Sequence, residues 1–325
     1  MTDRIVILDF GSQYTQLIGR RIRDLHVYCE LLPWHAKKEA ALDAQTKGII
    51  LSGGPQSIYA DNAPYIQDYL IESGLPILGI CYGMQALTHK LGGKVLQSNQ
   101  HEYGLTELDV PAANPLLVQG RQTVWMSHGD HVTELPPGFS CLATSPNSPF
   151  AAMMDEPNKR YGLQFHPEVH HTQHGKEILQ NFVLKICNCQ PGWTSSSIIE
   201  ESVAAIRARV GSGRVLSALS GGVDSAVTTA LVQKAIGDRV TAVFINTGLM
   251  RLGEPEQIEQ AFRPVLGDHL IMVEASERYF AKLAGVTDPE EKRKVIGESF
   301  IREFETVVAG LEEHEFLAQG TIYPD

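Results

Sequence analysis

Short apolar runs alternate with amphipathic segments in the first part of the chain. The apolar runs are typical of buried strands and lie at residues 4–9, 27–32, 48–51 and 76–80. The segments with helical spacing lie at residues 15–25, 61–73 and 84–91. Strands that alternate with helices predict a parallel α/β sheet, in which ligands bind beyond the carboxyl ends of the strands.

The pattern changes between residues 104 and 164, where short β-like runs are separated by Pro, Asn and Gly turns. We expect these runs to extend the first sheet in an antiparallel or mixed manner. They lie at residues 105–110, 124–126, 141–143, 150–153 and 160–165. A helix at residues 175–186 is expected to close this domain, which we place at residues 1–190.

A second series of strands and helices follows a stretch rich in Pro, Gly and Ser at residues 191–197, which we interpret as a linker. The predicted strands lie at residues 214–219, 240–246, 269–273 and 316–322. The predicted helices lie at residues 198–209, 226–236, 255–265, 277–284 and 289–308. Residues 198–325 are therefore expected to form a second α/β domain.

Composition and charge narrow the class of protein. With 325 residues, of which 43% are hydrophobic and 20% charged, the chain is long enough for two domains with sizeable cores. A formal net charge of −11 argues against a general nucleic-acid-binding or membrane-surface role. No apolar run approaches the roughly 20 residues that span a bilayer. The chain enters a strand at once and has five irregularly spaced cysteines, so we expect a cytoplasmic protein with reduced thiols.

The strongest chemical signal is a cysteine at a predicted strand-to-helix turn. Cys81 is flanked by Gly79 and Gly83, the G-x-nucleophile-x-G pattern in which a tight turn exposes the middle side chain. Glycine is needed at both flanking positions because a Cβ would crowd the turn. The positive end of the following helix favours the thiolate. A buried structural cysteine is the alternative, and the two glycines favour the nucleophile.

A nucleophilic cysteine needs a base and a group that orients the base. His166 and Glu168 are two residues apart, so in an extended strand they project from the same face. We expect Glu168 to hold the imidazole in one tautomer while the other ring nitrogen meets the sulfur. For the oxyanion, we expect backbone N–H donors at Gly53, Gly54 and Tyr82. A histidine with a purely structural partner at a strand end is the alternative.

A second glycine-rich turn, Ser-Gly-Gly-Val-Asp-Ser, lies between a predicted strand and a predicted helix at residues 220–225. Its backbone amides and hydroxyls suit a phosphate at the helix N-terminus. The turn contains no lysine, which disfavours a Walker-A NTPase. A turn needed only for packing is the alternative.

Three segments resemble motifs of the class I (triad) glutamine amidotransferases, in the same order along the chain: residues 52–55, 79–85 and 165–168. The resemblance implies a flavodoxin-like domain in which Cys81 attacks the side-chain amide of glutamine. The implied reaction proceeds through a thioester and releases ammonia, with His166 as base and Glu168 as its orienter. The implied residues for the oxyanion and for glutamine are Gly53, Gly54, Tyr82, Gln85, Ser127, His128, Gly129 and Asp130.

The second turn resembles the pyrophosphate loop of the N-type ATP pyrophosphatases. The resemblance implies a partial Rossmann-type domain of the adenine-nucleotide α-hydrolase kind, with Mg²⁺ held through ATP and Asp224 and with no separate metal site. The implied ATP-binding residues are Ser220, Gly221, Gly222, Val223, Asp224, Ser225 and Ala226.

Residues 8–14, 125–130, 244–251 and 317–325 extend the likeness along the whole chain to the family of glutamine-hydrolysing GMP synthases. Membership would imply a ligase of purine biosynthesis that converts XMP, ATP, glutamine and water to GMP, AMP, pyrophosphate and glutamate, with Mg²⁺ as cofactor. That family continues into a C-terminal dimerisation domain that contributes to XMP binding. We therefore expect this chain to be incomplete at its C-terminal end and the complete protein to be a homodimer.

Two positions depart from that family's pattern on the ATP side. Asn246 stands where the strand usually ends in Asp, and Glu298 stands where Arg is common. A chain competent only as a glutaminase is therefore an alternative. A non-catalytic regulator that binds glutamine or a nucleotide is another, and the full set of Cys81, His166 and Glu168 argues against it.

Histidines and cysteines near residue 180 raise the question of a metal site. His170, His171 and His174 are followed by Cys187 and Cys189, but paired metal-ligand spacing is lacking. We expect surface histidines and reduced thiols.

Overall fold

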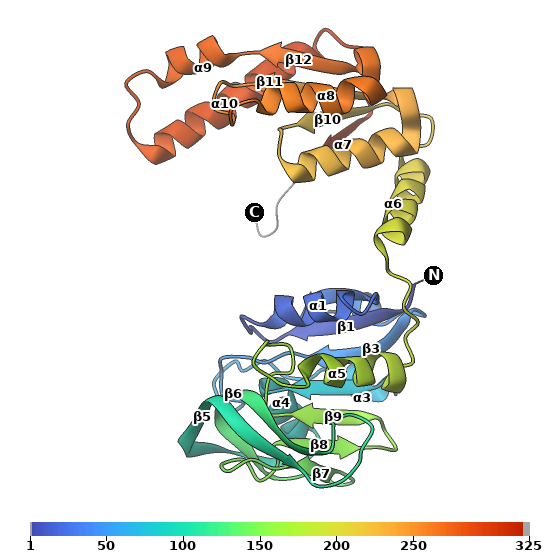
Figure 1. The fold of residues 1–325 in the computed structure, drawn as a ribbon, viewed down its shortest axis with the longest axis vertical. Coiled ribbons are helices and arrows are strands. Elements are labelled where there is room, and N and C mark those ends of the chain that lie inside the picture. Colours follow the sequence, from blue (N-terminus) through green and yellow to red (C-terminus); the bar gives the residue numbers. More distant parts are fainter. Residues whose placement is uncertain (1, 321–325) are drawn as a thin grey trace. The chain divides into compact units, whose positions relative to one another are not determined.

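The computed structural model describes residues 2–320, except for the side chains of residues 98–101. The chain divides into two compact units, one ending at Thr194 and the other beginning at Ser195 (Figure 1). We describe each unit by itself. No helix within residues 2–320 combines the length and apolar character needed to cross a membrane.

The first unit is built on a seven-stranded sheet with the strand order β2-β1-β3-β4-β9-β8-β7. Strands β2, β1, β3, β4 and β9 run parallel, in the order typical of flavodoxin-like folds, and β8 and β7 continue the sheet antiparallel. The α/β prediction is confirmed for this unit. The strands are β1 (Arg4–Asp9), β2 (Tyr28–Pro33), β3 (Thr46–Leu51), β4 (Ile77–Ile80), β7 (Ser140–Ala143), β8 (Ala152–Asp155) and β9 (Arg160–Leu163).

Both faces of this sheet are buried because successive residues of each strand point to opposite sides. In β1, Ile5 and Ile7 belong to one apolar cluster with α1 and α5, whereas Val6 and Leu8 belong to a second cluster with α3 and α4. Figure 1 shows these helices as the outer layers. The helices are α1 (Thr15–Arg23), α2 (Lys38–Ala41), α3 (Asp68–Glu72), α4 (Tyr82–Lys90) and α5 (Gly175–Gln180), and α5 continues as a π-helix (Asn181–Ile186).

The helix expected at residues 61–73 forms only over its last part, as α3. Asn62 has a left-handed φ of 62°. Pro64 also disfavours helical geometry at the residue before it. Helix formation is therefore delayed until Asp68.

Strands β5 (Lys94–Val110) and β6 (Gly120–Glu134) form a separate antiparallel ribbon. The expectation that residues 105–110 and 124–126 form strands of the main sheet is therefore wrong, whereas the other three predicted runs join it as β7, β8 and β9. An isolated antiparallel bridge between Asp109 and Thr144 joins the ribbon to the end of β7. Alternation explains the length of the ribbon, because buried and partly exposed residues alternate along the whole of β6.

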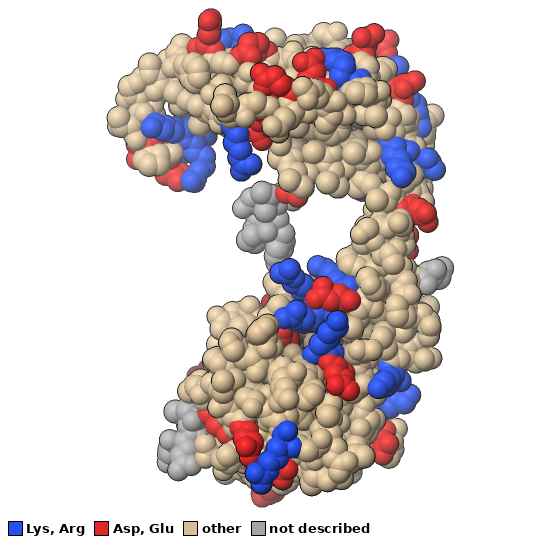
Figure 2. Space-filling model, in the orientation of Figure 1, with Lys and Arg blue, Asp and Glu red and all other residues tan. Residues whose placement is uncertain are grey.

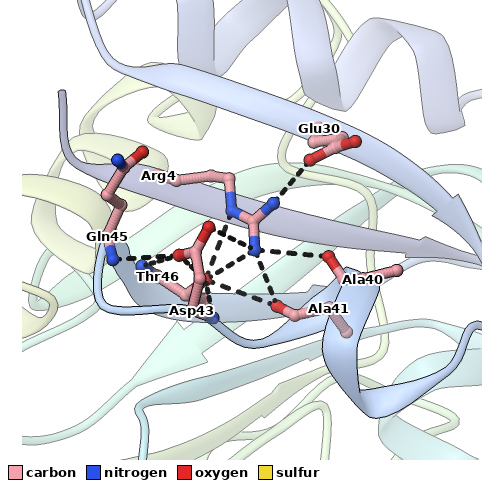
Figure 3. A network of polar contacts seen from close by, with 7 residues as sticks. All are labelled: Arg4, Glu30, Ala40, Ala41, Asp43, Gln45 and Thr46. Carbon is pink, nitrogen blue, oxygen red and sulfur yellow. Dashed lines mark hydrogen bonds and ion pairs between the residues drawn. The ribbon is translucent and has the colours of Figure 1, made fainter. Parts of the chain in front are cut away.

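A buried arginine joins the elements at the amino end of β1 (Figure 3). The Arg4 guanidinium donates hydrogen bonds to Glu30 Oε2 at 2.6 Å, to Thr46 Oγ1 at 2.9 Å and to the carbonyl oxygens of Ala40 and Ala41. It also lies 3.3 Å from Asp43 Oδ2. This network connects β1 to β2, α2 and the start of β3, at the end of the sheet opposite the carboxyl ends of the strands.

The second unit has a four-stranded parallel sheet with the order β12-β11-β10-β13. Helices α6, α7 and α8 contribute to the apolar cluster on one face, and α9 and α10 to the cluster on the other. The strands are β10 (Val215–Leu219), β11 (Val240–Asn246), β12 (Leu270–Glu274) and β13 (Phe316–Gln319). The helices are α6 (Ser195–Val210), α7 (Val223–Ile236), α8 (Glu254–Leu266), α9 (Ser276–Leu283) and α10 (Pro289–Val308), with 3-10 turns at Gly237–Arg239 and Gly267–His269.

Two boundaries in this unit differ from the sequence prediction or cannot be compared with it. Helix α6 begins at Ser195, so residues 195–197, which we expected in the linker, are helical. The predicted strand at residues 316–322 forms at Phe316–Gln319, and residues 321 and 322 lie outside the described part of the chain.

Charged side chains are unevenly placed on the face shown in Figure 2, where basic residues gather over α1. The last turn of α1 carries Arg20, Arg21 and Arg23. These positive charges oppose the negative end of the helix macrodipole, which accounts for their position without a ligand.

Candidate active site

Segments far apart in the sequence meet at the carboxyl edge of the first sheet. Gly53 and Gly54 follow β3, Cys81 follows β4 and His166 follows β9. Because β3, β4 and β9 are adjacent parallel strands, the sheet order places these three segments side by side. This edge is where parallel α/β sheets bind ligands.

Cys81 lies on a strained turn between β4 and α4. Its φ is 51° and its ψ is −107°, an unusual conformation for a residue with a side chain. The flanking glycines make the turn possible. A Cβ at Gly79 would lie 2.6 Å from the backbone of Gly83, and a Cβ at Gly83 would lie 2.4 Å from the carbonyl oxygen of Leu51. The predicted elbow geometry is therefore present.

His166 and Glu168 form a buried pair beside the cysteine. Glu168 Oε1 lies 2.7 Å from His166 Nδ1, and the Glu168 side chain is fully buried. Burial opposes the charged imidazole, but hydrogen bonds with Cys81 and Glu168 outweigh this and raise the pKa of His166 to about 10. The imidazole is therefore charged at neutral pH and places a positive charge beside Cys81. β9 ends at Leu163, so the two side chains meet without the extended strand that the sequence predicted.

A cavity of about 540 Å³ lies beside the catalytic residues, and Cys81 and His166 line it. Gln85 and residues 127–130, which the resemblance assigned to glutamine, also line it, as do residues 11–14 and 54–57. Gly53, Tyr82 and Glu168 are not among its lining residues. The Tyr14 ring meets the imidazole of His166 edge-on, with the ring centroids 5.1 Å apart.

Of the three residues expected to serve through their backbone N–H groups, Tyr82 and Gly54 are held most closely by their surroundings. Tyr82 is buried, and its hydroxyl donates to the carbonyl oxygen of Pro64 at 2.6 Å. Burial raises the pKa of Tyr82 to about 12, so its hydroxyl stays protonated as the donor of this hydrogen bond. A Cβ at Gly54 would lie 2.7 Å from the carbonyl oxygen of Phe10, so only glycine fits there.

The segment 127–130 contacts the catalytic turn directly. Cys81 Sγ lies 3.6 Å from the carbonyl oxygen of Ser127, and Gln85 Nε2 donates to the carbonyl oxygen of Asp130 at 2.7 Å. Asp130 is buried and lines the cavity, and its Oδ2 has no hydrogen-bond partner within the described residues. An unpaired carboxylate oxygen of this kind suits a cationic group of a ligand.

The His128 ring is held by a carboxylate that the sequence did not bring to attention. Glu102 is directly opposite His128 in the β5–β6 ribbon, and its Oε2 lies 3.2 Å from His128 Nε2. The other ring nitrogen lies 3.0 Å from the carbonyl oxygen of Asp130. Ser145 and Ser148 also donate to Glu102. The only signal for Glu102 would have been the register of two strands, which the sequence does not fix.

The second glycine-rich turn lies between β10 and α7. Gly221 has a left-handed φ of 88°, and Gly222 precedes the first residue of α7. Asp224 is exposed in the first turn of α7, whereas Ser225 is buried and its hydroxyl donates to the carbonyl oxygen of Gly222 at 3.0 Å. Ser225 thus closes the turn, and the exposed groups that remain for a ligand are those of residues 220–224.

Asn246 ends β11 and is engaged within the protein. Its Nδ2 donates to Glu274 Oε2 at 2.7 Å, and its Oδ1 accepts from the backbone N–H of Gly248. Asn246, which stands where the related proteins usually have Asp, thus has an acidic hydrogen-bond partner, Glu274, at the end of β12.

The histidines and cysteines near residue 180 do not come together as a metal site. His170 and His171 are exposed and His174 is half-buried, while Cys187 and Cys189 are buried free thiols. Within residues 2–320, no three His, Cys, Asp or Glu side chains are placed to hold a metal ion.

Comparison with known families agrees with this geometry. The model of the family described as glutamine amidotransferase class-I matches residues 6–186. The chain belongs to the class-I glutamine amidotransferase family. The matched region contains the elbow, the His166–Glu168 pair and the residues that line the cavity.

Curated relatives and a solved structure extend the likeness. Glutamine-hydrolyzing GMP synthases of Thermomicrobium roseum and Heliobacterium modesticaldum are each 51% identical over 99% of this chain. The GMP synthase of Xanthomonas axonopodis pv. citri is 50% identical over 100% of it. The chain spans 61%, 63% and 64% of these three proteins. The crystal structure of a putative GMP synthase subunit from Thermoplasma acidophilum covers 62% of this chain, and 98% of its own length aligns with a TM-score of 0.50 at 29% identity.

Proposed function

We propose that the first unit hydrolyses the side-chain amide of glutamine and releases ammonia. The observation that carries the proposal is the strained Cys81 elbow beside the buried His166–Glu168 pair, which has the arrangement of a nucleophile, a base and its orienter. Family membership supports the same reaction.

The steps follow from the positions of these groups. With the thiol proton already held by His166, the Cys81 thiolate attacks the amide carbon to give a tetrahedral intermediate. Backbone N–H groups of Gly53, Gly54 and Tyr82 stabilise the oxyanion. The imidazolium then gives its proton to the departing nitrogen, which leaves as ammonia, and a thioester remains on Cys81. Water, deprotonated by His166, cleaves the thioester and glutamate leaves.

The walls of the cavity supply the substrate contacts. We assign the unpaired Asp130 carboxylate oxygen to the substrate α-ammonium, because a buried anion without a partner is stabilised by a cation. The Gln85 amide and the Ser127–Gly129 backbone line the same cavity and offer polar groups to the rest of the glutamine.

The test is glutamate release from glutamine by Cys81→Ala. We expect a loss of about 10³-fold or more in kcat, as for the removal of other catalytic nucleophiles. Cys141→Ala is the matched control because Cys141 is an exposed free thiol outside the cavity. Activity in Cys81→Ala equal to that of Cys141→Ala would refute the nucleophile.

For the complete protein we propose the synthesis of GMP from XMP, ATP and ammonia, in a ligase that functions as a homodimer. The support is the likeness to glutamine-hydrolyzing GMP synthases over nearly the whole chain. The turn at residues 220–224 would hold the phosphates of ATP, and Asp224 would contribute a carboxylate oxygen to Mg²⁺ bound through ATP. ATP supplies the adenylyl group that activates XMP.

ATP binding provides a test of the second unit. Asp224→Ala should weaken ATP binding about tenfold in the presence of Mg²⁺ and leave it unchanged or improved with a chelator, because the carboxylate then only repels phosphate. Asp238→Ala, at the exposed opposite end of α7, is the control. Equal ATP affinity of the two variants with Mg²⁺ would contradict the assignment.

A further inference from the structure

A wholly buried amide contacts the sulfur of Cys81. Gln164 follows β9, its side chain has no exposed surface, and its Nε2 lies 3.8 Å from Cys81 Sγ. Its Oε1 accepts a hydrogen bond from Gln85 Nε2 at 3.3 Å. The same Gln85 nitrogen donates to the carbonyl oxygen of Asp130. Two side-chain amides therefore connect the wall of the cavity to the nucleophile.

The carbonyl oxygen of Asp130 fixes the direction of these hydrogen bonds. A backbone carbonyl oxygen can only accept, so the Gln85 atom at 2.7 Å from Asp130 must be the amide nitrogen. The second proton on that nitrogen then needs an acceptor, which makes the facing atom of Gln164 its oxygen. The remaining end of Gln164, the –NH₂ group, faces the sulfur. A reversed Gln164 would set two donors against each other.

We propose that Gln164 is a catalytic residue that stabilises the thiolate of Cys81 by donating a hydrogen bond to its sulfur. The proposal rests on Cys81 as the nucleophile of the proposed function. A thiolate is a strong acceptor, whereas a thiol is a weak one, so a donor held at the sulfur favours the charged form.

The position of the amide makes this donor selective for the sulfur. Gln164 is fully buried and lies outside the residues that line the cavity, so it cannot reach solvent or substrate. Its oxygen is already engaged by Gln85, which prevents the amide from turning. Gln164 therefore supplies a second donor to the sulfur, in addition to His166.

The direct test is the rate of alkylation of Cys81 by iodoacetamide as a function of pH, which reports the thiolate. All variants would carry Cys141→Ala, which removes the exposed thiol. Gln164→Leu and Gln164→Met keep an apolar side chain of similar size and remove the donor. We expect each to move the midpoint of the profile upward by about one pH unit, which corresponds to about 1.4 kcal/mol. The plateau at high pH should stay near the wild-type rate.

Gln122→Leu is the matched control. Gln122 is also a buried amide of the first unit, but it donates to the carbonyl oxygen of Val118 and does not line the cavity. Its variant should keep the wild-type midpoint. Gln85→Leu removes the contact that orients Gln164 and should move the midpoint in the same direction by less.

The outcomes separate the proposal from a packing role and from the proposed function. A packing defect would lower the plateau and leave the midpoint in place. Midpoints within about 0.2 pH unit of wild type in the folded Gln164 variants or in Gln85→Leu would overturn the proposal. If the midpoint moves but the wild type releases no glutamate from glutamine, the proposed function fails and the role of Gln164 stands. If Cys81→Ala abolishes glutamate release and the midpoint does not move, only the role of Gln164 fails.

Discussion

Replacement of Glu168 by glutamine tests the pair that activates Cys81. The substituted side chain would keep the size of the original and lose its charge. The carboxylate accepts from His166 Nδ1 through Oε1, and its Oε2 has no hydrogen-bond partner within the described residues. In Glu168→Gln, either the amide oxygen or the amide –NH₂ must therefore face the imidazole, and the other is left buried and unpaired.

Each orientation has a cost that can be worked from these contacts. If the oxygen faces Nδ1, a charge-assisted hydrogen bond becomes a neutral one. This costs about 1–1.5 kcal/mol and lowers the population of the charged imidazole roughly tenfold. If the –NH₂ faces Nδ1, the imidazole must carry its proton on Nε2 and cannot accept one from the sulfur. The wrong tautomer costs about 10⁴-fold in a serine triad. Because both orientations leave one unpaired polar group, we expect a mixture and a fall in kcat of about 10²- to 10⁴-fold.

The assay is glutamate release at saturating glutamine. KM should change by less than about threefold, because Glu168 does not line the cavity and its loss removes no ground-state contact with substrate. Glu177→Gln is the matched control, since Glu177 lies 3.5 Å from His174 in an exposed pair. A kcat for Glu168→Gln within about threefold of that of Glu177→Gln would refute the reasoning.

Four further predictions concern stability, and tryptophan fluorescence can follow the three that change the first unit, because all three tryptophans lie there. Gly83→Ala should destabilise this unit by about 1–3 kcal/mol, because its Cβ would meet the backbone of Leu51. Gly297→Ala in α10 has nothing within 4 Å of its Cβ and should instead stabilise the second unit by about 0.5–1 kcal/mol, measured by circular dichroism. Arg4→Met should cost about 2–4 kcal/mol, less than a fully buried pair because the carboxylates of Glu30 and Asp43 are partly exposed; a loss below about 0.5 kcal/mol would show that the network contributes little. Burial acts to raise the pKa of Asp43, but hydrogen bonds from Thr46 and Gln45 and the charge of Arg4 hold this pKa below 3.8. The stability that the Asp43 carboxylate contributes is therefore present above pH 3.8 and lost as pH falls through the folded pKa. The free energy of unfolding of Asp43→Asn, measured in urea, should be lower than that of the wild type at neutral pH and equal to it in acid.

The alternation of strands and helices could be predicted from the sequence because local apolar spacing carries that information. β1 and β4 appear where their apolar runs lie. The β5–β6 ribbon was not predicted as a separate sheet, because its length depends on cross-strand pairing. α3 was predicted too long because the helical spacing of residues 61–73 outweighed the local effect of Pro64 in our interpretation.

The candidate site divides in the same way. Cys81 and the His166–Glu168 pair could be proposed from the sequence because each depends on residues at most two positions apart. Glu102 and Gln164 could not, since they meet His128 and Cys81, which lie 26 and 83 positions away in the sequence, only through strand pairing. Their residue types carry no signal by themselves, because Gln and Glu are usually exposed.

The pairing of β9 with β4 places both the predicted His166 and the unpredicted Gln164 beside Cys81. Ile80 pairs with Leu163, and the backbone N–H of Cys81 donates to the carbonyl oxygen of Leu163 at 2.7 Å. The alternation continues past the end of β9: Gln164 and His166 both contact the sulfur, while Phe165 between them is buried in the apolar core. A shift of one residue in this pairing would set Phe165 against the sulfur and remove both polar contacts. The chemistry of Cys81 therefore depends on a hydrogen-bonded register as much as on the motif that contains it.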